Sequence, residues 1–338
     1  ARRTGLPVDT VLERIRTMLT AGTIRRVRQT LLATSLADGA LVAWQIDPEK
    51  LDAAFDYMAC EDPFSGHVVI RTTDAATTGS SYRLWTTLKV PQGYSIQKHA
   101  EFLRDRVGAA HFRLMPAKKL FVLGVGHIRR RGIEPGSRAD QLADVQGTSV
   151  VQLTAEEWQV LTSLKREFMP AEIQRNIWSA RAGEAGVNLR TFFEVAHRLD
   201  ERKVIGRFST FLEHVKATAG NERVTRYNAL FHWAVPAGKE IDAGREVGRH
   251  HIMTHAYWRE GGPEFRNVNI MGVAHGLDKS HLLEHKAAID AHLAESGIEV
   301  GYTNVFWGGR SEIKPSEISP QAYDEFCRRE GIDSETMR

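Results

Sequence analysis

The first half of this 338-residue chain reappears in its second half, and this repeat constrains the fold more than any other feature. A His-x-x-x-Arg element occurs in each half, and the prolines that end two strand-like runs have the same spacing of 188 positions. The matched residues are His67 and Arg71 with His255 and Arg259, and Pro48 with Pro236. Four upstream pairs match at an offset of 181, so one insertion near residues 216–226 reconciles the halves. A duplicated fold explains shared apolar positions, but it does not by itself require a shared imidazole and guanidinium.

Composition excludes several classes of protein. The chain is 42% hydrophobic and 26% charged, without an apolar run that could span a bilayer and without a signal-peptide pattern, which predicts a soluble cytoplasmic protein. Cys60 and Cys327 lie far apart and outside any metal-binding spacing, so neither a disulfide framework nor a zinc knuckle is expected. The net charge is only +3, and the local arginine clusters at 25–28 and 129–131 suit either nucleic acid or a polyanionic small molecule.

Periodicity predicts an α+β fold, a tandem repeat of a winged helix-turn-helix followed by a ferredoxin-like βαββαβ domain. In the first half the expected strands are 40–46, 67–71, 82–90 and a closing segment 112–125, with helices at 48–59 and 95–107. In the second half the expected strands are 204–212, 228–235, 255–259, 267–274 and 302–307. The expected helices there are 172–180, 190–202, 242–250, 279–295 and 320–330, preceded by a helix that a Thr154–Glu157 capping box opens.

These elements predict six segments along the chain. They are a partial winged helix-turn-helix at 1–33, a ferredoxin-like domain at 34–128, a linker at 129–152, a winged helix-turn-helix at 153–216, a second ferredoxin-like domain at 217–316 and a helical tail at 317–338. The first segment opens abruptly, without the helix that should precede it. The sequence therefore predicts a further N-terminal piece.

Several short motifs carry a family resemblance. They are Ile24–Arg26, Tyr82–Thr86, Leu114–Phe121, Ile205–Phe208, Thr254–Arg259 and Asn269–Met271, together with the two His-x-x-x-Arg elements. With them the chain resembles a siroheme decarboxylase whose two paired subunits are fused, on the plan of Lrp/AsnC regulators. It departs from the family pattern at 265–269, where a Trp-Pro-Tyr-Asn-like stretch is usual, and at Arg83, where asparagine is favoured.

The resemblance implies a chemistry. Siroheme decarboxylases remove carbon dioxide from two ring acetates of siroheme, giving didecarboxysiroheme on the route to haem or haem d1. The macrocycle can accept the electrons, so the protein needs no cofactor of its own, and the iron tetrapyrrole is the substrate. Arginine grips carboxylates through two parallel hydrogen bonds, while histidine or tyrosine can deliver the proton.

The candidate catalytic residues are His255, Tyr257 and Arg259, because alternate residues of a strand share one face. The matching first-half row has Val69 in the tyrosine position, so we expect one working site and one supporting site. The candidate substrate-binding residues are His67, Arg71, Tyr82, Lys118, Arg207, His214 and His275. We expect no metal site of the protein's own, although His255 or His214 could be an axial ligand to the substrate iron.

Each of these residues also has a plainer interpretation. A strand histidine with an arginine four positions on is more often a surface pair, Tyr257 could be a sheet former, and Lys118 could lie in a solvated turn. Two other functions stay open, a ligand-sensing DNA-binding regulator of the Lrp/AsnC type and a non-catalytic tetrapyrrole-binding protein. Helix 190–203 mixes acidic with basic residues, which disfavours phosphate contact. The expected ligand is thus a tetrapyrrole, and neither DNA nor a membrane is expected as a partner. The two halves should pair within the chain, and the chain could also bind a second copy of itself or subunits of the same pathway.

Overall fold

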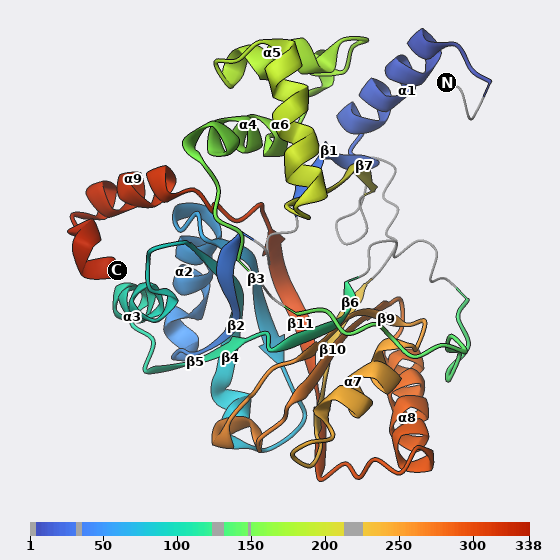
Figure 1. Cartoon of the computed structure of the whole chain (residues 1–338). Helices are drawn as coiled ribbons and strands as arrows, with labels where there is room; N and C mark the ends of the chain where they lie inside the picture. The colour runs from blue at the N-terminus through green and yellow to red at the C-terminus, as the bar shows by residue number, and fades with distance from the viewer. Residues whose placement is uncertain (1–4, 32–35, 124–131, 148–149, 213–225) are drawn as a thin grey trace. The chain divides into compact units, whose positions relative to one another are not determined.

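The computed structural model describes residues 5–31, 36–123, 132–147, 150–212 and 226–338 (Figure 1). The chain divides into two compact units, and each unit draws on both halves of the sequence. The first unit combines Ala1–Leu36 with Ser149–Val224, and the second combines Ala37–Thr148 with Thr225–Arg338. The two halves of the sequence therefore do not fold into two separate domains.

The first unit holds four α-helices among its described residues: α1 (Val8–Thr20), α4 (Ala155–Lys165), α5 (Ile177–Glu184) and α6 (Leu189–Glu201). The predicted capping box is confirmed, because the Thr154 hydroxyl accepts a bond from Glu157 N at 3.2 Å and Thr154 N donates to Glu157 Oε2 at 2.9 Å. The predicted helix 172–180 is wrong. The Glu172 carboxylate accepts from Met169 N at 2.7 Å and closes a short 3₁₀ turn, so α5 begins only at Ile177.

One antiparallel ribbon joins the two halves within this unit. Strand β1 (Ile24–Leu31) pairs with β7 (Ile205–Leu212), and the Gln29 amide donates to Gly206 O at 2.5 Å. The sequence predicted strand 204–212 but not its pairing with a strand of the other half. Pairing the two strands satisfies the backbone groups of each, which a lone strand cannot do.

The second unit is built on one nine-stranded, wholly antiparallel sheet in the order β5-β2-β4-β3-β11-β8-β10-β9-β6. Its first-half strands are β2 (Ala37–Gln45), β3 (Ser65–Thr72), β4 (Tyr82–Pro91), β5 (His111–Pro116) and β6 (Lys119–Leu123). Its second-half strands are β8 (Tyr227–Ala234), β9 (Met253–Trp258), β10 (Ile270–Gly276) and β11 (Tyr302–Ile313). The antiparallel α+β class is as predicted.

The two halves exchange strand edges. The predicted closing strand 112–125 is wrong as a single element, because β5 pairs with β2 of its own half while β6 pairs with β9 of the other half. Strand β11 of the second half likewise bridges the two halves, since its first part pairs with β8 of its own half and its last part pairs with β3 of the first half. Only two residues separate β5 from β6, which lie at opposite ends of the strand order, so the sheet must close on itself like a barrel.

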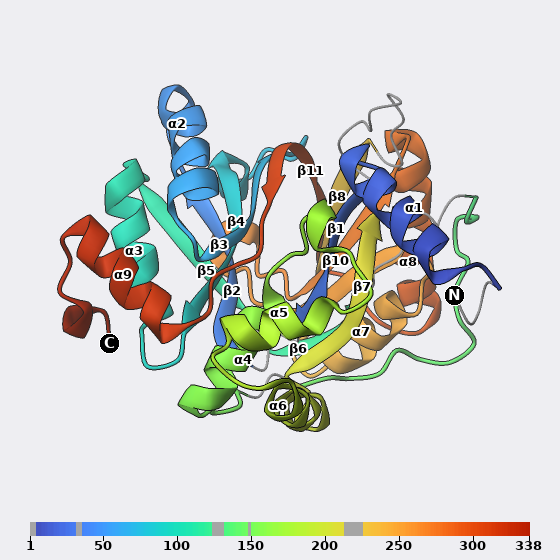
Figure 2. The ribbon, with the colours of Figure 1, turned by 90° about the horizontal axis from the view of Figure 1, so that it is seen from above.

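Helices cover the outer faces of this sheet, as Figure 2 shows. Helices α2 (Leu51–Asp56), α3 (Ile96–Val107) and α9 (Pro320–Glu330) lie over the first-half strands, and α7 (Glu240–Gly248) and α8 (Lys279–Glu295) lie over the second-half strands. Each helical layer has its own apolar core. A third core, which includes Trp85, Phe265 and Phe306, lies between the inner faces and contains residues of both halves.

The C-terminal helix is part of the first-half core. The sequence predicted its bounds correctly but as a tail that merely ends the chain. Tyr323 is fully buried, and its hydroxyl lies 3.0 Å from Nδ1 of His99, whose Nε2 lies 3.3 Å from the Asp62 carboxylate. This buried Asp–His–Tyr contact fixes α9 to the layer that α3 forms.

Several predicted strand boundaries are wrong, since β2 for example begins at Ala37 rather than 40, and two of the differences have a clear structural cause. Strand β10 begins at Ile270 rather than 267, because Arg266 and Asn267 have φ angles of 52° and 54° in the left-handed region, which breaks an extended chain. Strand β11 runs six residues beyond the predicted end at Trp307, since it continues onto β3. No helix within the described ranges is both long enough and apolar enough to cross a membrane.

Candidate active site inside the barrel

The predicted row on β9 faces the barrel interior. The rings of His255 and Tyr257 stack with centroids 6.0 Å apart and planes 8° apart, and the Arg259 guanidinium lies 4.5 Å from the Tyr257 ring. The alternate residues Ala256 and Trp258 pack instead into the outer core under α7 and α8. The prediction that His255, Tyr257 and Arg259 share one face is therefore consistent with the structure, and all three side chains are half-buried.

A chain of hydrogen bonds leads from this row to the first half. Arg71 Nη2 donates to Asn228 Oδ1 at 3.1 Å, and Asn228 Nδ2 lies 3.1 Å from His275 Nε2. His275 Nδ1 lies 3.3 Å from the Thr254 hydroxyl, which lies 3.2 Å from His255 Nδ1. We call these five residues, Arg71, Asn228, His275, Thr254 and His255, the polar chain. It joins three of the predicted site residues.

Strand register explains why the polar chain can form. Arg71, Gly308, Asn228 and His275 are cross-strand neighbours on β3, β11, β8 and β10. A Cβ at Gly308 would lie only 3.2 Å from Asn228 Cβ and 3.4 Å from Val69, so the absent side chain leaves Arg71 room to reach Asn228.

A β-bulge adds Thr254 to this row. The β9–β10 register shifts between Val273 and Ala274, which leaves Thr254 as the extra residue next to His255. A bulge turns a side chain that would otherwise point to the opposite face of the sheet. The hydroxyl of Thr254 thereby reaches both imidazoles.

The two arginines of the repeated motif make equivalent contacts. Arg71 donates to Phe306 O on β11 at 3.3 Å, and Arg259 donates to Met115 O on β5. Each guanidinium thus donates to a backbone carbonyl on a strand of the other half. The polar chain and the β9 row together connect one arginine to the other.

Three cations inside the barrel have no carboxylate partner among the described residues: Arg71, Arg259 and Lys89. Arg71 is only 4% exposed, and burial lowers the pKa of its guanidinium to about 9. Burial also lowers the pKa of Arg259. Burial, and then repulsion by Arg259, lower the pKa of Lys89 to about 8. Desolvated cations without acids mark a site that an anionic ligand would complete.

Other predicted residues lie apart from the polar chain. His67 Nε2 lies 3.2 Å from the Ser311 hydroxyl, two residues along β3 from the inward-facing Val69. Tyr82 packs in the inner core with its ring 5.2 Å from Phe265, and burial, followed by the charge of Glu264, raises its pKa.

Two further predicted residues do not reach the polar chain, and one cannot be placed. Lys118 is exposed, pairs with Glu260 and lies 5.1 Å from the Trp258 ring. Arg207 is exposed on β7 of the first unit, and its carbonyl accepts from Thr30 at 2.8 Å. His214 lies outside the described residues.

Sequence reasoning missed Asn228 and Lys89. Asn228 stands at the start of an apolar strand, where a polar residue usually marks only a strand end, and its side-chain partners come from two other strands, β3 and β10. Lys89 sits in the alternating run of β4, where a lysine normally faces solvent. Only closure of the sheet turns that face inward.

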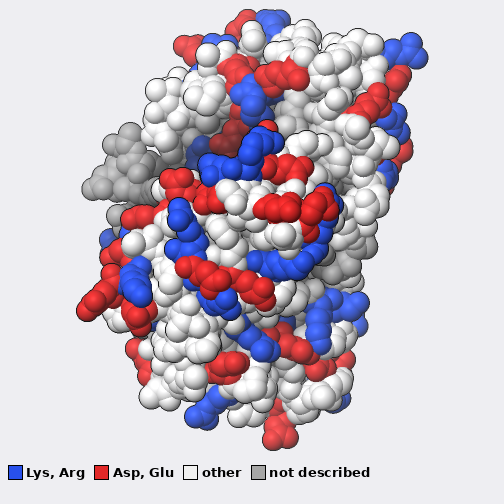
Figure 3. All heavy atoms as spheres, turned by 90° about the vertical axis from the view of Figure 1, so that its left-hand side faces the viewer, with Lys and Arg blue, Asp and Glu red and all other residues white. Residues whose placement is uncertain are grey.

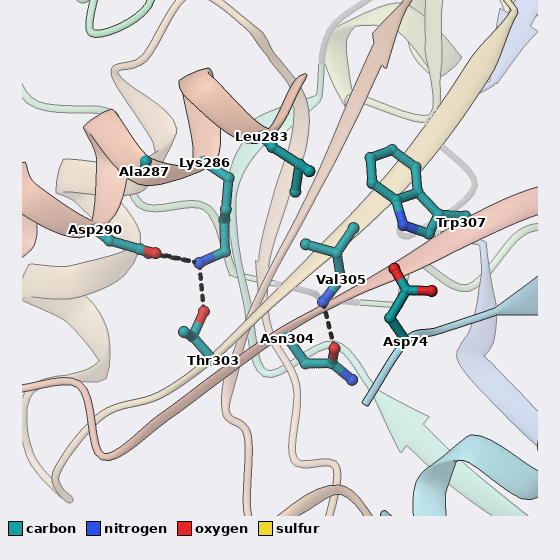
Figure 4. Close-up of a pocket in the computed structure, with 9 residues that line it drawn as sticks. All are labelled: Asp74, Leu283, Lys286, Ala287, Asp290, Thr303, Asn304, Val305 and Trp307. Atoms are coloured by element: carbon teal, nitrogen blue, oxygen red, sulfur yellow. Dashed lines mark hydrogen bonds and ion pairs between the residues drawn. The ribbon is translucent and has the colours of Figure 1, made fainter. Parts of the chain in front are cut away.

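A separate pocket of about 360 Å³ lies between α8 and β11 (Figure 4). It contains Lys286, whose ammonium contacts both oxygens of Asp290 at 2.6 and 2.7 Å. None of the predicted site residues lines it. Within the described ranges there is also no cluster of three or more histidine, cysteine or acidic residues that could hold a metal ion.

Known proteins share this architecture. Residues 36–121 match the AsnC-like ligand binding domain. Over 118 residues, which are 35% of this chain and 69% of the relative, the chain is 25% identical to the siroheme decarboxylase beta subunit of Oleidesulfovibrio alaskensis.

Solved structures extend the likeness to nearly the whole chain. The crystal structure of the siroheme decarboxylase NirDL superposes with a TM-score of 0.68, and its co-complex with an iron-uroporphyrin III analogue superposes with 0.67. Identity is 18% in both, and the matches cover 98% and 97% of this chain and 92% of each neighbour. The chain has the fold of a siroheme decarboxylase. Because the fold alone does not fix the reaction, the function has to be argued from the site.

Proposed function

We propose that this protein is a siroheme decarboxylase, a carboxy-lyase that converts ring acetates of siroheme or a close iron tetrapyrrole to methyl groups. The observation that carries the proposal is the continuous set of imidazole, phenol and guanidinium groups inside the barrel, whose cations lack carboxylate partners among the described residues. A ring that bears several carboxylates supplies the missing charges. The relatives described above act on or bind such rings.

The reaction needs few groups from the protein. The bond between the acetate CH₂ and its carboxylate breaks and carbon dioxide leaves. The electron pair of that bond is delocalised into the macrocycle and then forms the new C–H bond when a proton adds to the carbon to give CH₃. Arg71 and Arg259 would hold carboxylates that do not react, because a tight grip on the reacting one would stabilise the ground state. His255 and Tyr257 are the candidate proton donors, and burial raises the pKa of Tyr257, which keeps its phenol protonated.

The charges of the first unit favour a winged helix-turn-helix that has lost DNA binding over one that binds DNA. In α6, Arg190 pairs with Glu194 at 2.8 Å, and Arg198 pairs with Glu156 on α4 at 3.1 Å. Arg202 pairs with Glu157 at 2.6 Å. Figure 3 shows acidic and basic side chains interspersed over the face that it draws. Phosphate contact requires an excess of cations, which these internal pairs remove.

The test is anaerobic incubation of the protein with siroheme, followed by mass analysis of the pigment. Loss of two carbon dioxide units is expected. A shift of the absorption bands without loss of mass would contradict the enzyme and identify a carrier. A salt-sensitive gel shift with DNA, without any change in the siroheme spectrum, would identify a regulator.

A further inference from the structure

The polar chain has a direction that its first member determines. Arg71 can only donate, so the Asn228 side chain must turn its oxygen toward Arg71 and its amide nitrogen toward His275. His275 Nε2 then accepts, which leaves the proton of the neutral ring on Nδ1. That Nδ1–H donates to the Thr254 hydroxyl.

The same logic continues to His255. The Thr254 hydroxyl donates its single proton to Val273 O at 2.8 Å, so it can only accept from both imidazoles. His255 Nδ1 must therefore carry a proton, and the lone pair of the neutral ring lies on Nε2. Every donor and acceptor named here is satisfied by this one assignment, and the opposite tautomer of His255 would place two lone pairs against each other.

We propose that Asn228, His275 and Thr254 are positioning residues that hold His255 in the Nδ1–H tautomer and thereby make Nε2 the nitrogen that acts on the bound ring. This inference rests on the proposed function. It adds to it the residues that orient the imidazole and names Nε2 as the nitrogen that takes up a proton and then delivers it to the carbon that has lost carbon dioxide, while Nδ1–H stays bonded to Thr254. Such partners of a working histidine fix its tautomer and ring orientation.

The first half supports this assignment by what it lacks. At the 188-residue offset, Thr254 corresponds to Gly66. His275 lies two residues beyond Val273, the cross-strand partner of His255, and the residue two beyond Thr87, the cross-strand partner of His67, is Lys89. The bulge itself recurs there, since the β3–β4 register shifts between Ser65 and His67. The β-bulge is therefore present in both halves, but only the second half has the threonine hydroxyl and the second imidazole that complete the polar chain.

The decisive variant is Thr254→Val, which keeps the shape of the buried side chain and removes the hydroxyl that accepts from both imidazoles and donates to Val273 O. A matched control is Thr86→Val on β4, since Thr86 is also 0% exposed and its hydroxyl accepts from the Trp44 indole at 3.0 Å, in the outer layer away from the polar chain. We expect Thr254→Val to lower kcat about tenfold to a hundredfold with KM within about twofold, as loss of an orienting partner does. Thr254→Ser, which restores the hydroxyl, should recover most of kcat.

Three outcomes are separable. If Thr254→Val and Thr86→Val lose the same small amount of activity, the positioning role is wrong while the decarboxylase proposal stands. If the wild type releases no carbon dioxide from siroheme, both proposals are wrong. If only Thr254→Val loses kcat and serine restores it, the positioning role is supported, because a merely structural threonine would affect both variants alike.

The tautomer can be measured directly. In selectively ¹⁵N-histidine-labelled protein at about pH 8, above the ordinary histidine pKa, long-range ¹H–¹⁵N spectra distinguish a protonated Nδ1 from a protonated Nε2. We expect His255 and His275 to show a protonated Nδ1 in the wild type and in Thr86→Val, and a mixture for His255 in Thr254→Val. A protonated Nε2 on His255 in the wild type would overturn the assignment.

Discussion

Each buried cation inside the barrel carries a desolvation cost that no carboxylate among the described residues offsets. Within the described part of the chain, the Arg71 guanidinium has only a carbonyl and an amide oxygen as hydrogen-bond partners, and Lys89 has the like charge of Arg259 nearby. Such groups reduce the free energy of unfolding of the empty protein and favour binding of an anion. The unpaired charges of the site thus lower the stability of the empty protein, and replacing single residues can test this.

Replacing Lys89 with methionine should separate stability from binding. We expect the free energy of unfolding without ligand to rise by about 1 kcal/mol, because a desolvated charge is removed from beside Arg259. Affinity for iron-uroporphyrin should fall about tenfold, the value of one charge-assisted hydrogen bond. Urea unfolding and absorption titration measure the two quantities. Lys239→Met, at an exposed lysine 3.6 Å from Asp242, is the control and should change neither; a loss of stability in Lys89→Met would contradict the argument.

Tyr257→Phe tests the phenol. If Tyr257 delivers the proton, kcat for carbon dioxide release should fall by about 10² or more, the range for a lost general acid, while the ring still stacks on His255. Tyr302→Phe is the control, because Tyr302 is half-buried and its buried hydroxyl has no hydrogen-bond partner within the described part of the chain. Unchanged turnover in Tyr257→Phe would remove the tyrosine from the proton-donor role.

His232 predicts a pH dependence of stability. It is 1% exposed among aromatic rings, neither ring nitrogen has a partner among the described residues, and burial, then repulsion by Arg71 and Lys286, lower its pKa to about 3. Below the ordinary value of 6.5 the unfolded chain binds a proton that the folded protein does not, so stability falls as pH drops from about 6.5 to 3.

His232→Leu should flatten that slope by about 1.4 kcal/mol per pH unit and stabilise the protein at pH 7, since an unsatisfied polar ring is replaced by an apolar side chain. Urea unfolding between pH 4 and pH 7 measures it. Some slope should remain, because burial also lowers the pKa of His250 to about 3. An unchanged slope would show that His232 is not the buried neutral group inferred here.

At the scale of the elements, the exchanged strand β6 depends on a helix of the other half. A Cβ at Gly244 of α7 would lie 2.0 Å from the Phe121 ring of β6, and one at Gly248 would lie 3.1 Å from Phe121 Cβ. Glycine is normally unfavourable inside a helix. Its presence at Gly244 is explained by the close approach of β6.

Gly244→Ala should therefore lower the free energy of unfolding by about 1–3 kcal/mol, although alanine favours helix, because Phe121 cannot move without displacing β6. Gly183→Ala in α5 is the matched control. It has nothing within 4 Å of the added methyl group, so it should gain about 0.5–1 kcal/mol from helix propensity alone. Denaturant unfolding of both variants measures the pair; stabilisation by Gly244→Ala would contradict the packing argument.

For the second unit as a whole, closure of the sheet joins two related positions into one site. Arg71 and Arg259 occupy equivalent places, but Tyr257 corresponds to Val69, and the polar chain runs between the arginines as one connected set. A duplicated fold could in principle hold two ligands. The unequal side chains favour one.

We therefore expect one iron tetrapyrrole per chain. An anaerobic absorption titration with iron-uroporphyrin should reach its end point at one equivalent, because the two arginines serve the same ring. Arg71→Met and Arg259→Met should each weaken that single binding event. An end point at two equivalents, with one lost in each variant, would instead show two independent sites.

The sequence by itself determined the local structure and the repeated motif. Strand alternation, the capping box at Thr154 and the bounds of α8 and α9 follow from neighbours along the chain, so periodicity could predict them. The face shared by His255, Tyr257 and Arg259 follows from strand geometry alone.

Only the tertiary structure decided how the halves combine and which polar groups meet. The exchange of β6 and β11 depends on pairing between segments more than 100 residues apart, which no local pattern specifies. Thr254 joins His255 through a bulge, Asn228 meets Arg71 across a glycine, and Lys89 turns inward only because the sheet closes. Those contacts depend on the strand register and on closure of the sheet. Both are determined by packing of the whole unit rather than by residues that are neighbours in the sequence.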